Sequence, residues 1–261
     1  MNAAMTASGV MPLDRLVGAY LAETRYELTR MLRNAAFLLP IVAIPLAAYL
    51  LFGVVISTDA VANDPLVADY LFSGFAVMAV TGSALFGVGC TLALERDAGL
   101  MQLKRAQPAP AGSWLVAKML VAPVFAALAY APLLVVGVTL GKVTLSYGEL
   151  AAMSAVLLVG VFPFCALGLL IGALVRGSAA PAFINLIYLP MIWLSGMFFP
   201  LPKVLHGQTI IWPAFHLNQI ALSVAGVEKF VFIPVELAVG ALTGITVLCG
   251  ALAIWRLARK G

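Results

Sequence analysis

Histidine and cysteine, the side chains that most often bind metals or act as nucleophiles, are few in this sequence and widely spaced. His206 and His216 lie ten residues apart without a neighbouring cysteine or carboxylate cluster, which is more typical of satisfied or solvent-facing histidines than of metal ligands. Cys90, Cys165 and Cys249 form no Cys-x-x-Cys pair, and we expect each to be a buried apolar residue. No Gly-x-Ser-x-Gly motif occurs. The sequence therefore predicts neither a metal site nor a hydrolytic active site.

One glycine-containing stretch approaches a phosphate-binding loop without satisfying it. Residues 137–143 read Gly-Val-Thr-Leu-Gly-Lys-Val, so the two glycines are one residue too close, and valine stands where a magnesium-binding hydroxyl is needed. We therefore expect the chain to bind no cofactor, to have no ATPase site and not to be an enzyme.

The composition of the chain indicates that the helices holding these residues lie in a lipid bilayer. Hydrophobic residues make up 63% of the 261 residues and charged residues only 10%, against about 25% in an average soluble domain. Blocks almost free of charge recur along the chain, each long enough to cross a hydrocarbon core of about 30 Å. They predict an all-α integral membrane protein with six transmembrane helices, at residues 37–57, 70–94, 115–140, 150–175, 180–199 and 232–255.

Positive charge is distributed unequally between the two sides that this topology defines. Lys142, Lys203 and Lys229 fall on one side, and the other 12 of the 15 lysines and arginines fall on the opposite side. Because Lys and Arg near span ends are retained in the cytoplasm, both termini are predicted to be cytoplasmic. We expect a multi-pass protein of the cytoplasmic (inner) membrane, and the net charge of +4 then requires no nucleic-acid partner.

Titratable groups inside the spans are scarce, which bears on the source of energy. Glu236, about one turn inside the last span, is a candidate substrate-contacting or gating residue. Its position also lets it reach the membrane interface, where it would have neither role. Ion-coupled transport needs titratable groups near the membrane centre, so uphill transport would have to be driven by a separate nucleotide-binding subunit.

An amphipathic segment precedes the first span. Over residues 12–33 the apolar side chains crowd one arc at 100° per residue, and the arginines lie mostly away from it. The pattern predicts an interfacial helix at the cytoplasmic membrane surface, which either anchors the first span or docks on a partner. We therefore expect a cytoplasmic tail and interfacial helix at 1–35, a six-helix membrane domain at 36–256 and a cytoplasmic tail at 257–261.

The connection between the second and third spans is the most charge-dense part of the chain. Residues 95–108 read Glu-Arg-Asp-Ala-Gly-Leu-Met-Gln-Leu-Lys-Arg-Ala-Gln-Pro. Retention in the cytoplasm explains the basic residues but not the acidic ones, the turn at Gly99 or the stop at Pro108. The segment therefore predicts a short, protein-facing helix at the membrane surface.

This stretch resembles the Glu-Arg-Glu-x-Gly-Thr-Leu-x-x-Leu-x-x-x-Pro segment of ABC-2 type transporter permeases. In that family the segment leads into the coupling helix, which contacts the ATPase. Lys104 stands where the family usually has leucine, so we expect Leu100 and Leu103, three residues apart, to be the apolar contacts. The resemblance implies ATPase coupling for Glu95, Arg96, Asp97, Gly99, Leu100, Leu103 and Pro108.

Two further stretches carry the same resemblance. Ser-Gly-Met-Phe-Phe-Pro at 195–200 and Trp-Pro-Ala-Phe-His-Leu-Asn-Gln at 212–219 are similar to the family's Ser-Gly-x-Phe-x-Pro and Pro-x-x-His-x-x-Gln regions. Residues 201–225 are too interrupted for a span and predict an external re-entrant segment or a surface-lying helix pair. By resemblance this region is the external gate, with Phe198, Phe199, Pro200, Trp212 and Pro213.

The resemblance covers nearly the whole chain and implies the permease subunit of an ATP-driven exporter. Two permease copies, as a homodimer or a heterodimer, would each dock on an ABC ATP-binding subunit that uses ATP and magnesium. The entry to the first span is similar to that of the drug- and lipid-export branch, which favours a drug, a lipid or a lipid-linked molecule over a polysaccharide. A membrane assembly or maturation factor and an ATP-independent channel are the alternatives with the same architecture.

Overall fold

The computed structural model describes residues 12–106, 110, 112–199 and 203–260, and every regular element within them is a helix. In chain order these are α1 (Leu13–Leu32), α2 (Ala35–Ala48), the π-helix η1 (Tyr49–Ile56), α3 (Thr58–Asn63), α4 (Leu66–Asp97), α5 (Leu100–Ala106), α6 (Ser113–Thr139), α7 (Tyr147–Val159), α8 (Phe162–Leu174), α9 (Ala180–Leu194), the 3-10 helix η2 (Lys203–Leu205), α10 (His206–Thr209), α11 (Pro213–Val224), the 3-10 helix η3 (Glu228–Phe230) and α12 (Val235–Lys260).

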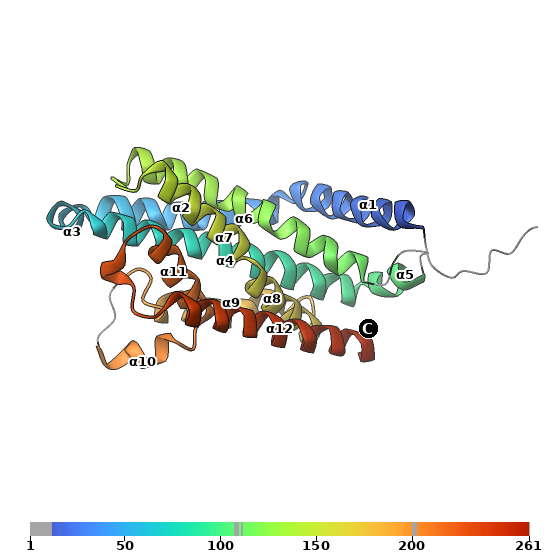
Figure 1. The fold of residues 1–261 in the computed structure, drawn as a ribbon. Coiled ribbons are helices and arrows are strands. Elements are labelled where there is room, and N and C mark those ends of the chain that lie inside the picture. Colours follow the sequence, from blue (N-terminus) through green and yellow to red (C-terminus); the bar gives the residue numbers. More distant parts are fainter. Residues whose placement is uncertain (1–11, 107–109, 111, 200–202, 261) are drawn as a thin grey trace, which may run out of the picture.

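The long helices lie side by side, and the two ends of the bundle carry different elements (Figure 1). The start of α1, the helix α5 and the C-terminal end of α12 lie at one end, which we call the α5 end. The helices α3, α10 and α11 lie toward the other, which we call the α11 end.

Five helical stretches are long and apolar enough to cross a membrane, so the chain is a multi-span membrane protein. They are Ala35–Ile56, Leu66–Asp97, Ser113–Thr139, Tyr147–Leu174 and Val235–Arg259. Each lies within a few residues of a predicted span.

The span predicted at 180–199 is shorter than the sequence indicates. Helix α9 has 15 residues, about 22 Å at 1.5 Å per residue, whereas the hydrocarbon core measures about 30 Å. The helix ends because Gly196 adopts a left-handed conformation, with φ at 66°, which glycine takes without steric cost. The predicted boundary at 199 was therefore wrong, and residues 195–199 belong to the connection that follows α9.

Helix α4 forms the core of the bundle, and most of its side chains are buried. It packs against α2, α6, α8, α9 and α11. The crossing with α8 is close because glycines meet there: a Cβ atom on Gly172 would lie 2.6 Å from the carbonyl oxygen of Gly89. The Gly-x-x-x-Gly pair at 168 and 172 thus serves packing within the chain. A Cβ atom at Gly240 or Gly244 would meet no described neighbour within 4 Å.

The fourth span is broken between α7 and α8. Pro163 has no N–H to donate to the carbonyl of Val159, so the helical hydrogen bonding is interrupted there. Gly160 lies at the break, and a Cβ atom on it would lie 2.2 Å from Cδ1 of Leu217. The break therefore admits α11 close against the backbone of the bundle.

Helix α4 is also much longer than the first span. Its 32 residues measure about 48 Å at 1.5 Å per residue, whereas the 22 residues of α2 and η1 measure about 33 Å. Near the α5 end, α1 packs lengthwise on α6, where Met31 contacts Val121 and Phe125. The last turns of α4 and the first turns of α6 thus join α1, which precedes the first span.

The amphipathic helix predicted at 12–33 is α1, but it runs along α6 in the direction of the long helices and not across the end of the bundle, as an interfacial helix would (Figure 1). Its contacts also divide the predicted apolar arc. Met31 is buried, whereas Leu13, Val17 and Leu21 are exposed. The other buried side chain of α1 is a carboxylate, that of Glu27. This position is explained by the ion pairs described below.

Candidate coupling and gating sites

The Glu-Arg-Asp triplet that the sequence assigns to ATPase coupling ends α4, and its three side chains bind three different parts of the bundle. The Oε1 atom of Glu95 forms ion pairs with Lys118 of α6, at 2.9 Å, and with an arginine of α1. Arg96 donates hydrogen bonds to carbonyls at the end of α8. Asp97 accepts a hydrogen bond of 2.7 Å from the backbone N–H of Gly177. The triplet therefore fastens several helices to one end of α4.

The guanidinium of Arg96 caps the C-terminus of α8. Its Nη1 lies 3.0 Å from the carbonyl oxygen of Gly172 and also contacts that of Ala173, and its Nη2 lies 2.7 Å from that of Val175. The last carbonyls of a helix have no intrahelical donor, and the helix dipole favours a positive charge beside them. With its side chain only 20% exposed, Arg96 is engaged inside the protein.

Helix α5 confirms the short helix predicted after the triplet. Gly99, at a φ of 70°, makes the turn from α4 that the sequence predicts. Met101 anchors α5 in the core, whereas Leu100 and Leu103 are 39% and 62% exposed. Lys104 forms an ion pair with Glu23 of α1. Pro108 lies outside the described residues.

Four charged side chains form a buried cluster at this end of the bundle, which we call the charge centre: Glu27, Arg30, Glu95 and Lys118. Lys118 Nζ lies 2.6 Å from Oε1 of Glu27, and Arg30 Nη2 lies 2.8 Å from that same oxygen. The side chains of Lys118, Glu27 and Glu95 are at most 4% exposed. Burial alone would raise the pKa of Glu27, but the charges of Lys118 and Arg30 outweigh it and hold that pKa below its ordinary value.

The charge centre is not among the features that the sequence predicts. Lys118 counts there only as one of the cytoplasmic retention charges, and Glu27 has no predicted role. A signal is nevertheless present: Glu27 lies four residues before Met31 on the apolar arc of α1, and Lys118 lies seven before Phe125 on α6. A charge on each of two apolar helix faces is the pattern of a buried pair.

At the α11 end, the residues predicted to form an external gate have two different environments. Phe198 is buried and stacks on Phe75 of α4 with ring centroids 4.5 Å apart. Phe199 is 52% exposed. Trp212 is half-buried and donates a hydrogen bond from Nε1 to Gln208, at 2.7 Å. The structure therefore brings Phe198, but not Phe199, into the core; Pro200 lies outside the described residues.

Helix α11 follows Trp212, and nearly all of its side chains are buried. Pro213 occupies its first position, where the missing N–H costs nothing. Asn218 accepts a hydrogen bond of 2.7 Å from Ser73 of α4, and Gln219 bonds backbone groups of Phe230 and Phe232. His216 bonds the carbonyl of Ile210 through Nε2. Its Nδ1 is buried and has no hydrogen-bond partner among the described residues, so the backbone satisfies only one of the two ring nitrogens.

The remaining candidate residues fall outside these two clusters. Glu236 is exposed in the first turn of α12. The three cysteines are buried. Within the described part of the chain, no three His, Cys, Asp or Glu side chains are grouped closely enough to hold a metal ion.

A long apolar groove lies between α2, α4 and α9. It consists of a cavity of about 550 Å³, reaching from Asn34 to Leu189, and a second of about 190 Å³ that continues from Leu189 to Phe198 and Phe199. Both are lined by Met78. The groove thus leads from the start of the first span to the predicted gate.

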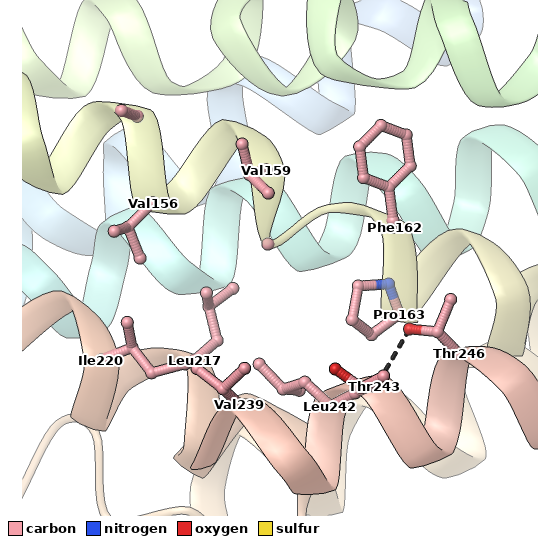
Figure 2. Close-up of a pocket in the computed structure, with 12 residues that line it drawn as sticks. Val156, Val159, Phe162, Pro163, Leu217, Ile220, Val239, Leu242, Thr243 and Thr246 are labelled. Carbon is pink, nitrogen blue, oxygen red and sulfur yellow. Dashed lines mark hydrogen bonds between the residues drawn. The ribbon is translucent and has the colours of Figure 1, made fainter. Parts of the chain in front are cut away.

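Another cavity, of about 480 Å³, lies where the fourth span is broken (Figure 2). Val159 and Pro163 line one side, and Leu217 of α11 and Leu242 of α12 line the other. Its hydroxyl groups are on α12, where Thr246 donates to the carbonyl of Leu242 at 2.7 Å. This cavity is separate from the groove beside α9.

The fold and these sites define an all-helical, multi-span membrane protein with an apolar groove and a charge-dense end. Residues 19–232 match the family model of the ABC-2 type transporter, and the chain belongs to this family. It is 29% identical over 196 residues to a Bacillus subtilis (strain 168) protein named "Putative transport permease YvfS", an alignment that covers 74% of this chain and 80% of that protein. The chain is thus an ABC-2 permease, a transport subunit without an ATPase domain.

Proposed function

We propose that the chain is the permease of an ATP-driven exporter that moves a drug, a lipid or a lipid-linked molecule out of the cytoplasm or the inner leaflet. The observation that carries this proposal is the apolar surface of α5. Leu100 and Leu103 are exposed there, while the residues around them are fixed by Met101 and by the contacts of the triplet at 95–97. An exposed apolar surface on a firmly held helix is suited to docking a partner.

The partner is an ABC ATP-binding subunit, and the α5 end is the cytoplasmic face of the bilayer. Most of the lysines and arginines fall in the segments at this end, and the positive-inside rule places such an end in the cytoplasm. The permease is a six-span protein in which α9 serves as the short fifth span. Glu95, Arg96, Asp97 and Gly99 act in coupling by holding α5 in place, and Pro108 is assigned to coupling by its place in the family motif.

The substrate is hydrophobic because most of the side chains that line the groove between α2, α4 and α9 are apolar. The external gate consists of Phe198, Phe199, Pro200, Trp212 and Pro213, of which Phe198 and Phe199 line the far end of the groove. A second copy of the permease closes the open side of the groove, where Ile44 and Leu189 are 57% and 48% exposed. Glu236, exposed in the first turn of α12, contacts polar parts of the substrate outside the groove.

Co-purification of the ATPase tests the central claim. We expect L100S/L103S to reduce the amount of ATPase retained by the permease at least tenfold without changing its thermal unfolding in detergent. The matched control is V204S, because Val204 is 92% exposed and lies at the opposite end of the bundle. Retention of the ATPase by L100S/L103S would refute the assignment of α5.

The gate is tested separately by F199A. Because Phe199 is exposed and lines the end of the groove beside Phe198, this variant should change ATP-driven substrate uptake into inverted vesicles and retain the ATPase in full. Loss of the ATPase from F199A would mean that the orientation in the membrane is reversed. Conductance of the purified chain in liposomes without an ATPase would favour the channel alternative.

A further inference from the structure

The charge centre joins three helices that are far apart in sequence. Glu27 and Arg30 come from α1, Glu95 from the end of α4 and Lys118 from the start of α6. Two carboxylates face two cations, so the cluster is electrically neutral. Each carboxylate contacts both cations through Oε1, so no single pair carries the connection alone.

Lys118 is the member that closes the cluster. Its side chain is only 1% exposed, and it contacts α1 through Glu27 and α4 through both Glu95 and Thr91. Removing one partner of a buried ion pair leaves an uncompensated charge in a poor solvent, so the cluster strongly resists partial opening.

The apolar contacts of α1 do not by themselves define its position. Met31, Val121 and Phe125 form a small cluster between α1 and α6, with a few half-buried side chains packed against it. Apolar contact is non-directional and would tolerate sliding of one helix along the other. Buried charged groups, in contrast, are best attested as devices that fix the register of helices.

We propose that Lys118 is a positioning residue for coupling, which locks α1, the end of α4 and the start of α6 into one rigid unit. The turn at Gly99 leads directly from Glu95 and its neighbours into α5, so a force applied to α5 reaches this unit first. Because the unit is rigid, the force displaces the spans that α4 and α6 form instead of bending the joint. This proposal rests on the proposed function, since the force is that of the ATPase.

A first experiment tests the lock without any ATPase. Spin labels at Leu21 on α1 and Leu120 on α6, both exposed, report the distance between the two helices. The double variant E27Q/K118M removes one negative and one positive charge, leaves the pair of Arg30 and Glu95 intact, and so avoids an unpaired charge. We expect one narrow distance distribution in the purified wild-type chain and a distribution at least twice as broad in E27Q/K118M.

The matched control is D64N/K229M, which removes an exposed ion pair at the α11 end and makes the same change in charge. Its distance distribution should equal that of the wild type. A distance distribution in E27Q/K118M as narrow as that of the wild type would refute the proposal that Lys118 locks the three helices together. This conclusion does not depend on the partner of the protein.

A second experiment tests the coupling in the complex with the ATPase. In the wild-type background, ATP with vanadate should change the rate of maleimide labelling at F199C. We expect E27Q/K118M to bind the ATPase. Its nucleotide-driven change in labelling rate should be at least fivefold smaller than that of the wild type. A disulfide or a short thiol crosslink in M31C/V121C should restore it, because the crosslink replaces the lock without replacing its charges.

The outcomes separate the two proposals. If the wild-type chain retains no ATPase, the proposed function fails. If it retains the ATPase and E27Q/K118M responds like the wild type, only the role of Lys118 fails. Absence of rescue by the crosslink would also overturn a positioning role.

Discussion

Replacing Arg96 with alanine should lower the free energy of unfolding of the permease. This effect arises within the permease and does not require the ATPase. Arg96 donates to the carbonyls of Gly172, Ala173 and Val175, which then lose their donor. A hydrogen bond to a charged group is worth about 1.5–3 kcal/mol, and the lower figure applies here because the side chain is partly exposed. Allowing for partial repair by water, we expect a loss of about 3 kcal/mol, or roughly a hundredfold in the folding equilibrium.

The assay is equilibrium unfolding in mixed micelles with increasing sodium dodecyl sulfate, followed by tryptophan fluorescence. R176A is the matched control, because Arg176 lies just beyond the same turn but is exposed. Its effect should stay within about 0.5 kcal/mol. R96K should fall between the two, since an ammonium group cannot span three carbonyls as a planar guanidinium does.

Equal stability of R96A and R176A would refute the assignment of Arg96 as a helix cap. In that case the side chain would be free to contact the ATPase, as a literal interpretation of the sequence motif suggests. A folded R96A that no longer retains the ATPase, with unchanged stability, would lead to the same conclusion.

Three further predictions concern packing and charge. G172A should lower the free energy of unfolding by about 2 kcal/mol in the same assay, because its Cβ would lie 2.6 Å from a carbonyl oxygen of α4. G240A has open space around it and should raise that free energy by about 0.5 kcal/mol. Equal effects of the two variants would contradict the close crossing of α4 and α8. F198A should lower the free energy of unfolding by about 3 kcal/mol and F199A by less than about 0.5 kcal/mol, because only Phe198 is buried against the core. A larger loss of thermal stability in F199A than in F198A would contradict the structure. The pKa of Glu27 is lowered by folding, so its contribution to stability is complete above the unfolded-state value of about 4.3 and is lost as the pH falls below it. Thermal midpoints between pH 7 and pH 3.5 should therefore drop less in E27Q than in the wild type, and parallel curves would show that Glu27 does not carry this acid sensitivity.

Hydrophobic blocks in the sequence were sufficient to predict the long helices, because a chain in lipid must satisfy its backbone hydrogen bonds within each span. The end of α9 was predicted too late. The apolar residues 195–199 read as a continuation of the span, whereas the left-handed turn at Gly196 and the packing of Phe198 on Phe75 divert the chain.

Side-chain roles at the α5 end could be predicted only in part. The spacing of Leu100 and Leu103 in a short helix predicts an apolar contact surface, and both side chains are exposed in the structure. The partners of Arg96 could not be predicted, because they lie more than 70 residues away in sequence. Those of Lys118 could not either, because it joins Glu95, 23 residues away, to Glu27, 91 residues away. A single sequence shows which charges are present but not which of them meet.

The length of α4 has one more consequence. Its α11 end carries Tyr70, whose hydroxyl donates to the carbonyl of Gly196 in the connection beyond α9, and its other end carries the triplet at 95–97. A straight helix of about 48 Å that tilts by about 5° around its middle moves each tip by about 2 Å in opposite directions. Opposite faces of the membrane are thus linked by the geometry of one rod, and a ligand that arrests one tip arrests the other to the same degree.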